Sequence, residues 1–168
     1  NNGFHYATIR KGDSSSTFSI NGQPVVNSAA LVCYDNNGTF LWKTEDTTTT
    51  TGRILLNDLS FDPQNNIFIA GSIGGLNGNS FLGFSNSLYG AGFLMKTNPT
   101  ATSLLWASSP SNSTTGRATP RAIYNNGSEI AITSSAGAGP ILTWGSQTIT
   151  VAGSNQGTDV LLARFNSA

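Results

Sequence analysis

The chain has 168 residues, which suits one ordinary domain, and only 10% of them are charged. Eight basic side chains balance eight acidic ones. Nucleic acids and anionic membrane surfaces are bound by clusters of Lys and Arg, so this balance argues against both partners. Apolar runs stay well short of the roughly 18 residues that a membrane span needs. Ser, Thr and Asn account for 59 residues, as is usual in extracellular β-rich proteins, and we expect a secreted or cell-surface protein.

Short runs of β-branched and aromatic residues, each bounded by turn residues, recur along the chain and predict an all-β fold. Helical periodicity is almost absent. Asn-Gly pairs, whose residues tolerate positive φ, mark several of the turns. In chain order we expect strands at residues 5–10, 17–20, 30–34, 39–43, 55–61, 67–71, 92–96, 103–107, 121–124, 129–133, 141–144, 147–151 and 160–165.

The chain repeats itself at a fixed period. Trp42 is followed eleven residues later by Arg53, and Trp106 is followed eleven residues later by Arg117, so both residues recur 64 residues apart. Aligning the copies gives a unit of four meandering strands, which is the sheet of a propeller blade. The approximate units are residues 1–52, 53–116 and 117–168. We therefore expect one repeat region of tandem four-stranded antiparallel meanders that form β-propeller-like blades.

Two segments carry a resemblance to a known family. Residues Asn65 to Gly71 read Asn-Asn-Ile-Phe-Ile-Ala-Gly, and residues Asp35 to Trp42 read Asp-Asn-Asn-Gly-Thr-Phe-Leu-Trp. With the strand order, they resemble the seven-bladed β-propeller repeats of bacterial secreted and surface proteins. The period of 64 is long for such repeats, and residues 98–102 replace the Asn-Gly turn in the second copy. The family carries no catalytic signature, so the resemblance implies no catalytic residue.

The strand order also predicts an incomplete propeller. The chain opens at the second strand of one unit and stops after the third strand of another, which gives about two and a half units, whereas a propeller has about four to eight blades. Open edges and apolar sheet faces are costly when exposed. We therefore expect the chain to be a segment of a larger protein, or neighbouring chains to complete the assembly.

Three functions remain open at this point. The leading prediction is a non-enzymatic extracellular structural or interaction module, whose partners are other proteins or the remaining blades of a larger protein, and no cofactor is expected. A carbohydrate-binding propeller is the second; it needs an exposed aromatic ring and amides that converge on a groove. Part of a polysaccharide-active enzyme is the third; it needs two carboxylates that face each other across a sugar.

Most of the residues that could take part in catalysis or metal binding are assigned structural roles. His5 is the one histidine, so a catalytic triad or a two-histidine metal site would depend wholly on it. The turns at residues 35–38 and 62–66 each hold a single carboxylate, too few for a typical calcium loop, and no metal ligands are assigned. The eight carboxylates are assigned to turns, caps and solvated loops, and Cys33 to a buried position.

Structural roles are also expected for most of the tryptophans and arginines considered as site residues. The repeated Trp42 and Trp106 are interpreted as shared core positions, and Arg53 and Arg117 as loop anchors. Trp144 has no repeat counterpart, which makes it the weak ligand-binding candidate, as a platform on which a sugar could stack. Acceptor sequons for N-glycosylation, relevant if the source is eukaryotic, begin at Asn37, Asn112 and Asn126.

Overall fold

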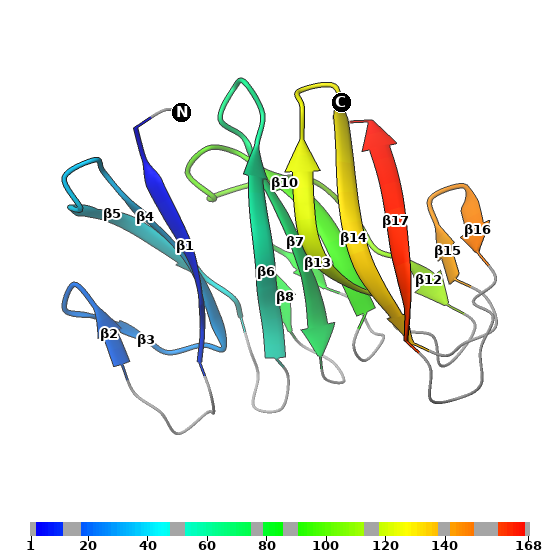
Figure 1. The fold of residues 1–168 in the computed structure, drawn as a ribbon. Coiled ribbons are helices and arrows are strands. Elements are labelled where there is room, and N and C mark those ends of the chain that lie inside the picture. The colour runs from blue at the N-terminus through cyan, green and yellow to red at the C-terminus, as the bar shows by residue number, and fades with distance from the viewer. Residues whose placement is uncertain are drawn as a thin grey trace.

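The computed structural model describes residues 3–11, 18–47, 53–74, 79–85, 91–112, 118–137, 142–149 and 158–166. Every regular element in these ranges is a β-strand, so the predicted all-β class is confirmed. Three main antiparallel sheets follow one another along the chain and across the molecule, coloured blue to cyan, green, and yellow to red (Figure 1). We call them the first, second and third sheets.

The second sheet is a complete meander. It contains β6 (Arg53–Phe61), β7 (Ile67–Gly74), β10 (Ala91–Thr97) and β11 (Leu104–Ser108), paired in the order β6-β7-β10-β11. Its strands are the four that the repeat predicts for residues 53–116. Two of its connections are short turns with Asn or Asp at the start, whose side-chain oxygens accept hydrogen bonds from the turn backbone.

The first and third sheets each contain three strands of the same meander. The first sheet pairs β1 (His5–Arg10), β4 (Ala29–Tyr34) and β5 (Phe40–Glu45), which correspond to β7, β10 and β11. The third sheet pairs β13 (Ala118–Asn125), β14 (Glu129–Gly137) and β17 (Thr158–Asn166), which correspond to β6, β7 and β10. Within the described residues, the first sheet therefore lacks a first strand and the third sheet lacks a fourth.

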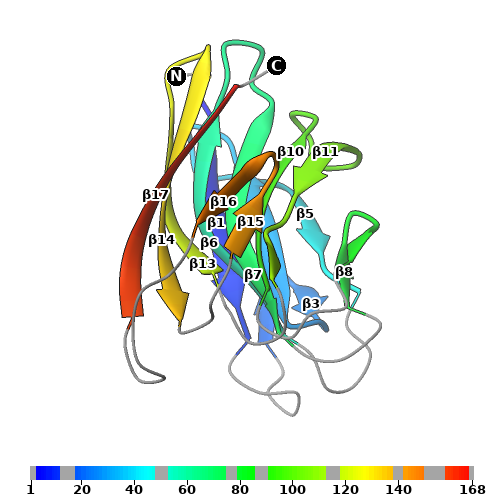
Figure 2. The ribbon, with the colours of Figure 1, turned by 90° about the vertical axis from the view of Figure 1, so that its right-hand side faces the viewer.

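A small hairpin lies between the second and third strands of every unit. These hairpins are β2 (Phe18–Ile20) with β3 (Gln23–Val25), β8 (Ser80–Phe81) with β9 (Phe84–Ser85), and β15 (Leu142–Trp144) with β16 (Gln147–Ile149), the last extended by β12 (Ser111–Asn112). Figure 2 shows β15 and β16 standing apart from the third sheet. The predicted excursion thus has its own structure. β2, β15 and β16 lie within predicted strands, whereas β3, β8, β9 and β12 were not predicted, because strands of two or three residues give little alternation.

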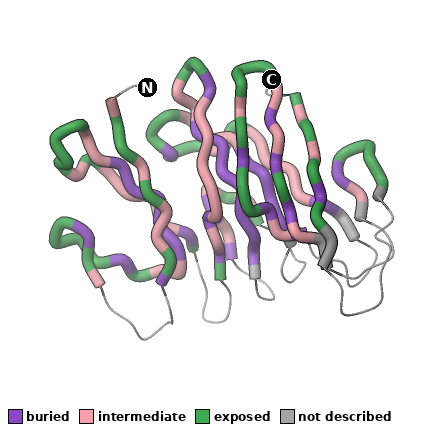
Figure 3. The backbone as a smooth tube through the Cα atoms, in the orientation of Figure 1, coloured by how far each residue is buried: buried purple, intermediate pink, exposed green. Residues whose placement is uncertain are grey.

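The sheets stack face to face through apolar side chains. Leu31 of the first sheet shares a buried apolar cluster with Ile69 and Phe93 of the second, and Leu94 of the second shares another with Ile132 of the third. All five of these side chains are 0–1% exposed, and Figure 3 shows the buried positions running through the strands that face one another. In the second sheet, alternation along each strand assigns one face to the first sheet and the other to the third.

Hydrogen bonds between β6 and β13, the first strands of their units, fix the spacing of the second and third sheets. A β-bulge interrupts the pairing at Asn57 in β6 and at Arg121 in β13, which are again 64 residues apart. Asn57 donates to the carbonyl of Pro120 at 2.5 Å, and the Asp58 carboxylate accepts from the Ile123 N–H at 2.8 Å. The bulge leaves backbone groups free of the ladder, so they can bond to the neighbouring sheet.

Candidate functional site

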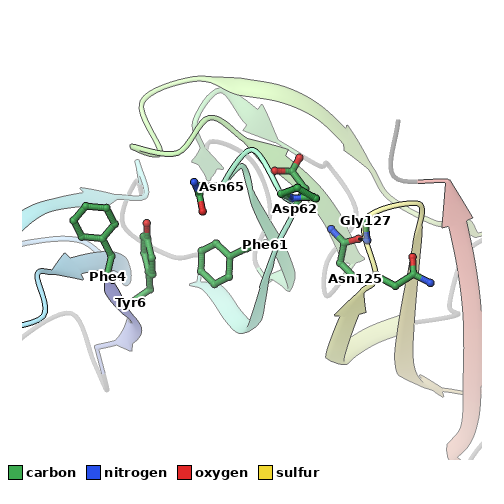
Figure 4. Close-up of a pocket in the computed structure, with 9 residues that line it drawn as sticks. Phe4, Tyr6, Phe61, Asp62, Asn65, Asn125 and Gly127 are labelled. Atoms are coloured by element: carbon green, nitrogen blue, oxygen red, sulfur yellow. Dashed lines mark hydrogen bonds between the residues drawn. The ribbon is translucent and has the colours of Figure 1, made fainter. Parts of the chain in front are cut away.

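A pocket of about 440 Å³ opens at the turn ends of the three sheets. Figure 4 shows aromatic side chains on one side of it and the turn that carries Asn125 and Gly127 on the other. The pocket draws on β1, on the turn that follows β6 and on the turn that follows β13, so each main sheet contributes. Its lining consists of Phe4, Tyr6, Phe61, Asp62, Pro63, Asn65, Asn125, Asn126 and Gly127.

The aromatic side of the pocket joins the first and second sheets. The Tyr6 and Phe61 ring centroids are 4.7 Å apart and tilted by 42°, and Tyr6 also meets Trp42 edge-on at 6.0 Å. Phe4 is 42% exposed, which leaves part of its ring open to solvent. Aromatic faces next to amide groups are a surface on which sugars can stack and hydrogen-bond.

Asp62 is fixed by its own turn and is not free to act as a base. Its carboxylate accepts from the N–H groups of Gln64 at 3.0 Å and Asn66 at 2.8 Å, and from the Asn66 side-chain amide at 2.8 Å. Lys96 pairs with it at 3.2 Å. Burial raises the pKa of Asp62, but the hydrogen bonds from Asn66 and the Lys96 charge outweigh burial and lower the pKa overall.

The amide side of the pocket is formed by an asparagine turn. Asn125 Oδ1 accepts from the Gly127 N–H at 2.7 Å, whereas its Nδ2 is buried and has no hydrogen-bond partner among the described residues. Asn126 Oδ1 accepts from the N–H groups of Ser128 at 3.0 Å and Glu129 at 2.8 Å. Asn65, across the pocket, has a φ of 63°, which asparagine tolerates better than most residues.

A second hollow of about 410 Å³ runs down from this pocket between β1 and β6, and we call it the β1–β6 groove. It shares Phe4, Tyr6 and Phe61 with the pocket above. The remaining lining residues are His5, Thr8, Asn57, Asp58 and Leu59. The groove therefore follows the outer edge of the first sheet, beside the strand at which the second sheet begins.

The carboxylates whose side chains are described all take part in structural contacts. Asp46 is fully buried, accepts from the Ser28 hydroxyl at 2.6 Å and the Ala29 N–H at 2.8 Å, and has a pKa raised by burial. Glu45 accepts from the backbone before β4, and Glu129 pairs with Arg164. No group of three or more His, Cys, Asp or Glu side chains that could hold a metal ion occurs in the described part of the chain.

Trp144 lies in a setting that does not suit sugar stacking. It is 4% exposed, its ring meets Phe165 edge-on at 5.2 Å, and its Nε1 donates to Ser108 Oγ at 2.9 Å. No open ring face is left, so the proposed platform role is corrected to a core role. Trp42 and Trp106 occupy matching positions, and each meets an aromatic ring of its own sheet edge-on at 6.0 Å.

The other predicted residues are spread over the molecule. Cys33 is buried and free, and His5 lies on β1 beside the groove. Arg53 is exposed at the start of β6, whereas Arg117 lies outside the described residues.

The three glycosylation sequons lie apart from one another. Asn37 and Asn126 lie in exposed turns and Asn112 lies in β12, so the structure does not bring the three sequons together.

The pocket residues were missed by sequence reasoning. Phe4, Phe61 and Asn125 are far apart in the chain, and each looked like an ordinary strand or turn residue. The register of the repeat was the available signal, because it places the end of every first strand and the start of every second strand at the same end of the molecule.

No family model, curated protein or solved structure matches the chain. Among the described residues, no helix is long and apolar enough to cross a membrane. The features that point to a function are therefore the repeat and the surfaces that the sheets leave exposed.

Proposed function

We propose that the chain is a run of β-propeller-like repeats that serves as a non-enzymatic, extracellular structural and interaction module. Its role is to stack with a further sheet of the same kind, supplied by a larger protein or by a neighbouring chain. The observation that carries the proposal is an apolar face on the third sheet. The equivalent faces of the first and second sheets are buried against the sheet that follows.

Equivalent residues on the three faces differ in exposure. Leu31 on β4 and Leu94 on β10 are both 0% exposed, because each lies under the following sheet. The register of β17 puts Leu162 at the equivalent position, opposite Thr133, where it is 66% exposed. Val160, two residues earlier on the same face, is 86% exposed. Exposed apolar side chains grouped on one face are typical of an interaction surface.

The outer edge of β17 supports the same proposal. In the first two sheets the third strand pairs with a fourth, as β4 does with β5 and β10 does with β11. β17 has β14 as its one partner among the described strands. Such an edge is ready to pair with an added strand. A following unit would supply both that strand and the sheet that covers Leu162.

Val160 sets a condition on the sheet that docks. It occupies the position of Gly92, and a Cβ on Gly92 would lie 2.2 Å from the carbonyl oxygen of Ala118 and 2.4 Å from Pro120. A sheet identical to the third one would therefore collide with Val160. The natural partner must lie farther from β17, or present less bulk at this point.

The proposal is tested by adding one unit to the chain. Residues 99–166 are repeated after Asn166, and Val160→Gly is introduced so that the new contact copies the one between the second and third sheets. We expect this extended chain to unfold in one transition with a larger free energy of unfolding than the original chain, because stacked repeats stabilise each other through their interfaces.

The matched control is the same extended chain with Ile130→Asp and Ile132→Asp in the added copy only. These changes put charge on the face that docks, so the gain in the free energy of unfolding should disappear. An extended chain that is no more stable than its control, or that unfolds in two independent steps, would contradict the proposal.

Glycan binding in the pocket is a second candidate function. The partly exposed ring of Phe4 and the amides of Asn65, Asn125 and Asn126 meet the requirement for an aromatic ring and convergent amides. Calorimetric titration with a panel of neutral oligosaccharides tests it. Phe4→Ala should abolish binding, whereas Leu105→Ala, at an exposed position on β11, should leave it unchanged. Binding that survives Phe4→Ala would place the sugar elsewhere.

A further inference from the structure

Among the described residues, one strand position of the first sheet is unfilled. β7 in the second sheet lies between β6 and β10, and β14 in the third lies between β13 and β17. β1 is the equivalent strand of the first sheet, but β4 is its one neighbour among the described strands. The repeat therefore identifies the open side of β1 as the place of a first strand.

The β1–β6 groove lies at this position. Tyr6 and Thr8 line it from β1, and Leu59 and Phe61 line it from β6. In the next pair of sheets, the first strand β13 packs directly against β6, β7 and β10. A strand in the groove would make the corresponding contacts with β6 and would extend the first sheet to four strands.

We propose that the β1–β6 groove binds an extended strand of a partner polypeptide, antiparallel to β1 and carrying an Asn-Asp pair. A free strand edge offers N–H and C=O groups at the spacing of another strand, and this favours a polypeptide over other ligands. The inference depends on the repeat of the meander and not on the docking of a further sheet to β17, so either proposal can fail alone.

The Asn-Asp pair follows from the contact between β6 and β13. Asn57 and Asp58 bridge to the carbonyl of Pro120 and the N–H of Ile123. The repeat offset of 64 maps these two groups onto Leu56 and Leu59 of β6. The Leu59 N–H donates to Asp58 Oδ1 of its own strand at 2.9 Å, and a bound aspartate would compete for it.

The register of the bound strand can be stated. In the second sheet, Asp58 lies opposite Ala70 and Phe61 lies opposite Ile67. The matching residues of β1 are Thr8 and His5. We therefore expect the aspartate of the bound strand to lie opposite Thr8, with its side chain directed toward β6.

The test uses the 168-residue chain and a labelled peptide with the sequence of residues 53–61, followed by fluorescence anisotropy. A peptide with the sequence of residues 118–125 is the natural control, because Ala122 stands at its aspartate position. We expect the first peptide to bind saturably and the second to bind at least about tenfold more weakly, since it lacks the charged hydrogen bond.

Two paired controls distinguish strand addition from adhesion to an apolar surface. Peptides N-methylated on one or the other alternate set of residues should differ, because only one set of N–H groups points toward β1. Thr8→Trp should fill the groove and abolish binding, whereas Ala7→Trp, on the other face of β1, should not. Equal affinity of both methylated peptides, or binding that survives Thr8→Trp, would overturn the proposal.

Discussion

Asp62 links a turn of the second sheet to Lys96 and lies under the candidate pocket. Its pKa is lowered in the folded protein, so its contribution to stability is complete above about pH 4, the range of an unfolded aspartate, and is lost as pH falls through the lower folded value. We expect Asp62→Asn to lower the free energy of unfolding by about 1–3 kcal/mol at pH 7.

Urea unfolding of the two proteins at pH 7 and near pH 3 measures this effect. The difference in the free energy of unfolding between wild type and Asp62→Asn should narrow at the lower pH. Protonation of Asp62 removes the carboxylate charge from the wild type, just as the substitution removes it from the variant. A difference that stays constant over this range would show that the carboxylate charge does not stabilise the turn.

The indoles of Trp144 and Trp106 give a second prediction at the scale of single residues. Trp144 donates to Ser108, whereas Nε1 of Trp106 is buried and has no hydrogen-bond partner in the described part of the chain. Trp144→Phe should therefore cost about 1 kcal/mol more than Trp106→Phe, because only the former loses a hydrogen bond. Thermal or urea unfolding of both variants checks this, and the reverse order would contradict the assigned partners.

From the sequence, the setting of a single residue was easier to predict than the residues that it contacts. Sequence reasoning placed Cys33, Trp42 and Trp106 on strands or in the core from their apolar context and repetition. It left Trp144 open because no second copy exists to compare with it. It could not find the pocket, since the contact of Phe4 and Tyr6 with Phe61 depends on how two sheets stack.

At the scale of elements, β10 approaches β13 closely at Gly92, where the second and third sheets meet. Gly92→Ala would put a Cβ 2.2 Å from the Ala118 carbonyl, so the sheets must move apart. We expect a loss of about 1–3 kcal/mol in the free energy of unfolding. Val160→Ala is the control at the equivalent repeat position, where exposure predicts a change within about 0.5 kcal/mol.

Chemical denaturation of both variants gives the comparison. If both substitutions lower the free energy of unfolding by an equally small amount, β10 and β13 lie farther apart than the structure has them. If both lower it by an equally large amount, Val160 is covered in solution.

The strands of the three meanders were predictable because their length and β-branched residues give a clear signal against the Asn-rich turns. The hairpins were only partly predictable. Their strands are two or three residues long, and their position is set by single aromatic contacts such as Phe84 with Phe93. Such contacts act between elements, and they leave no periodic pattern in the chain.

At the scale of the whole molecule, the repeat predicted which strands pair and in what order. It also predicted that the first unit begins at its second strand and that the last ends at its third. It did not predict the stacking geometry, because that geometry depends on the bulges at Asn57 and Arg121 and on the absence of a side chain at Gly92. The free edge of β1 and the exposed face of β17 follow from the order of strands alone.

The Leu162 face of the third sheet is, in our proposal, the surface on which a further sheet docks. Leu162→Cys tests it through the rate of labelling by a thiol reagent, because Cys33 is 1% exposed and should react slowly. We expect rapid labelling in the 168-residue chain and a slowing of about tenfold or more in the extended chain, where access requires local opening. Unchanged labelling in the extended chain would contradict the claim that a further sheet covers this face.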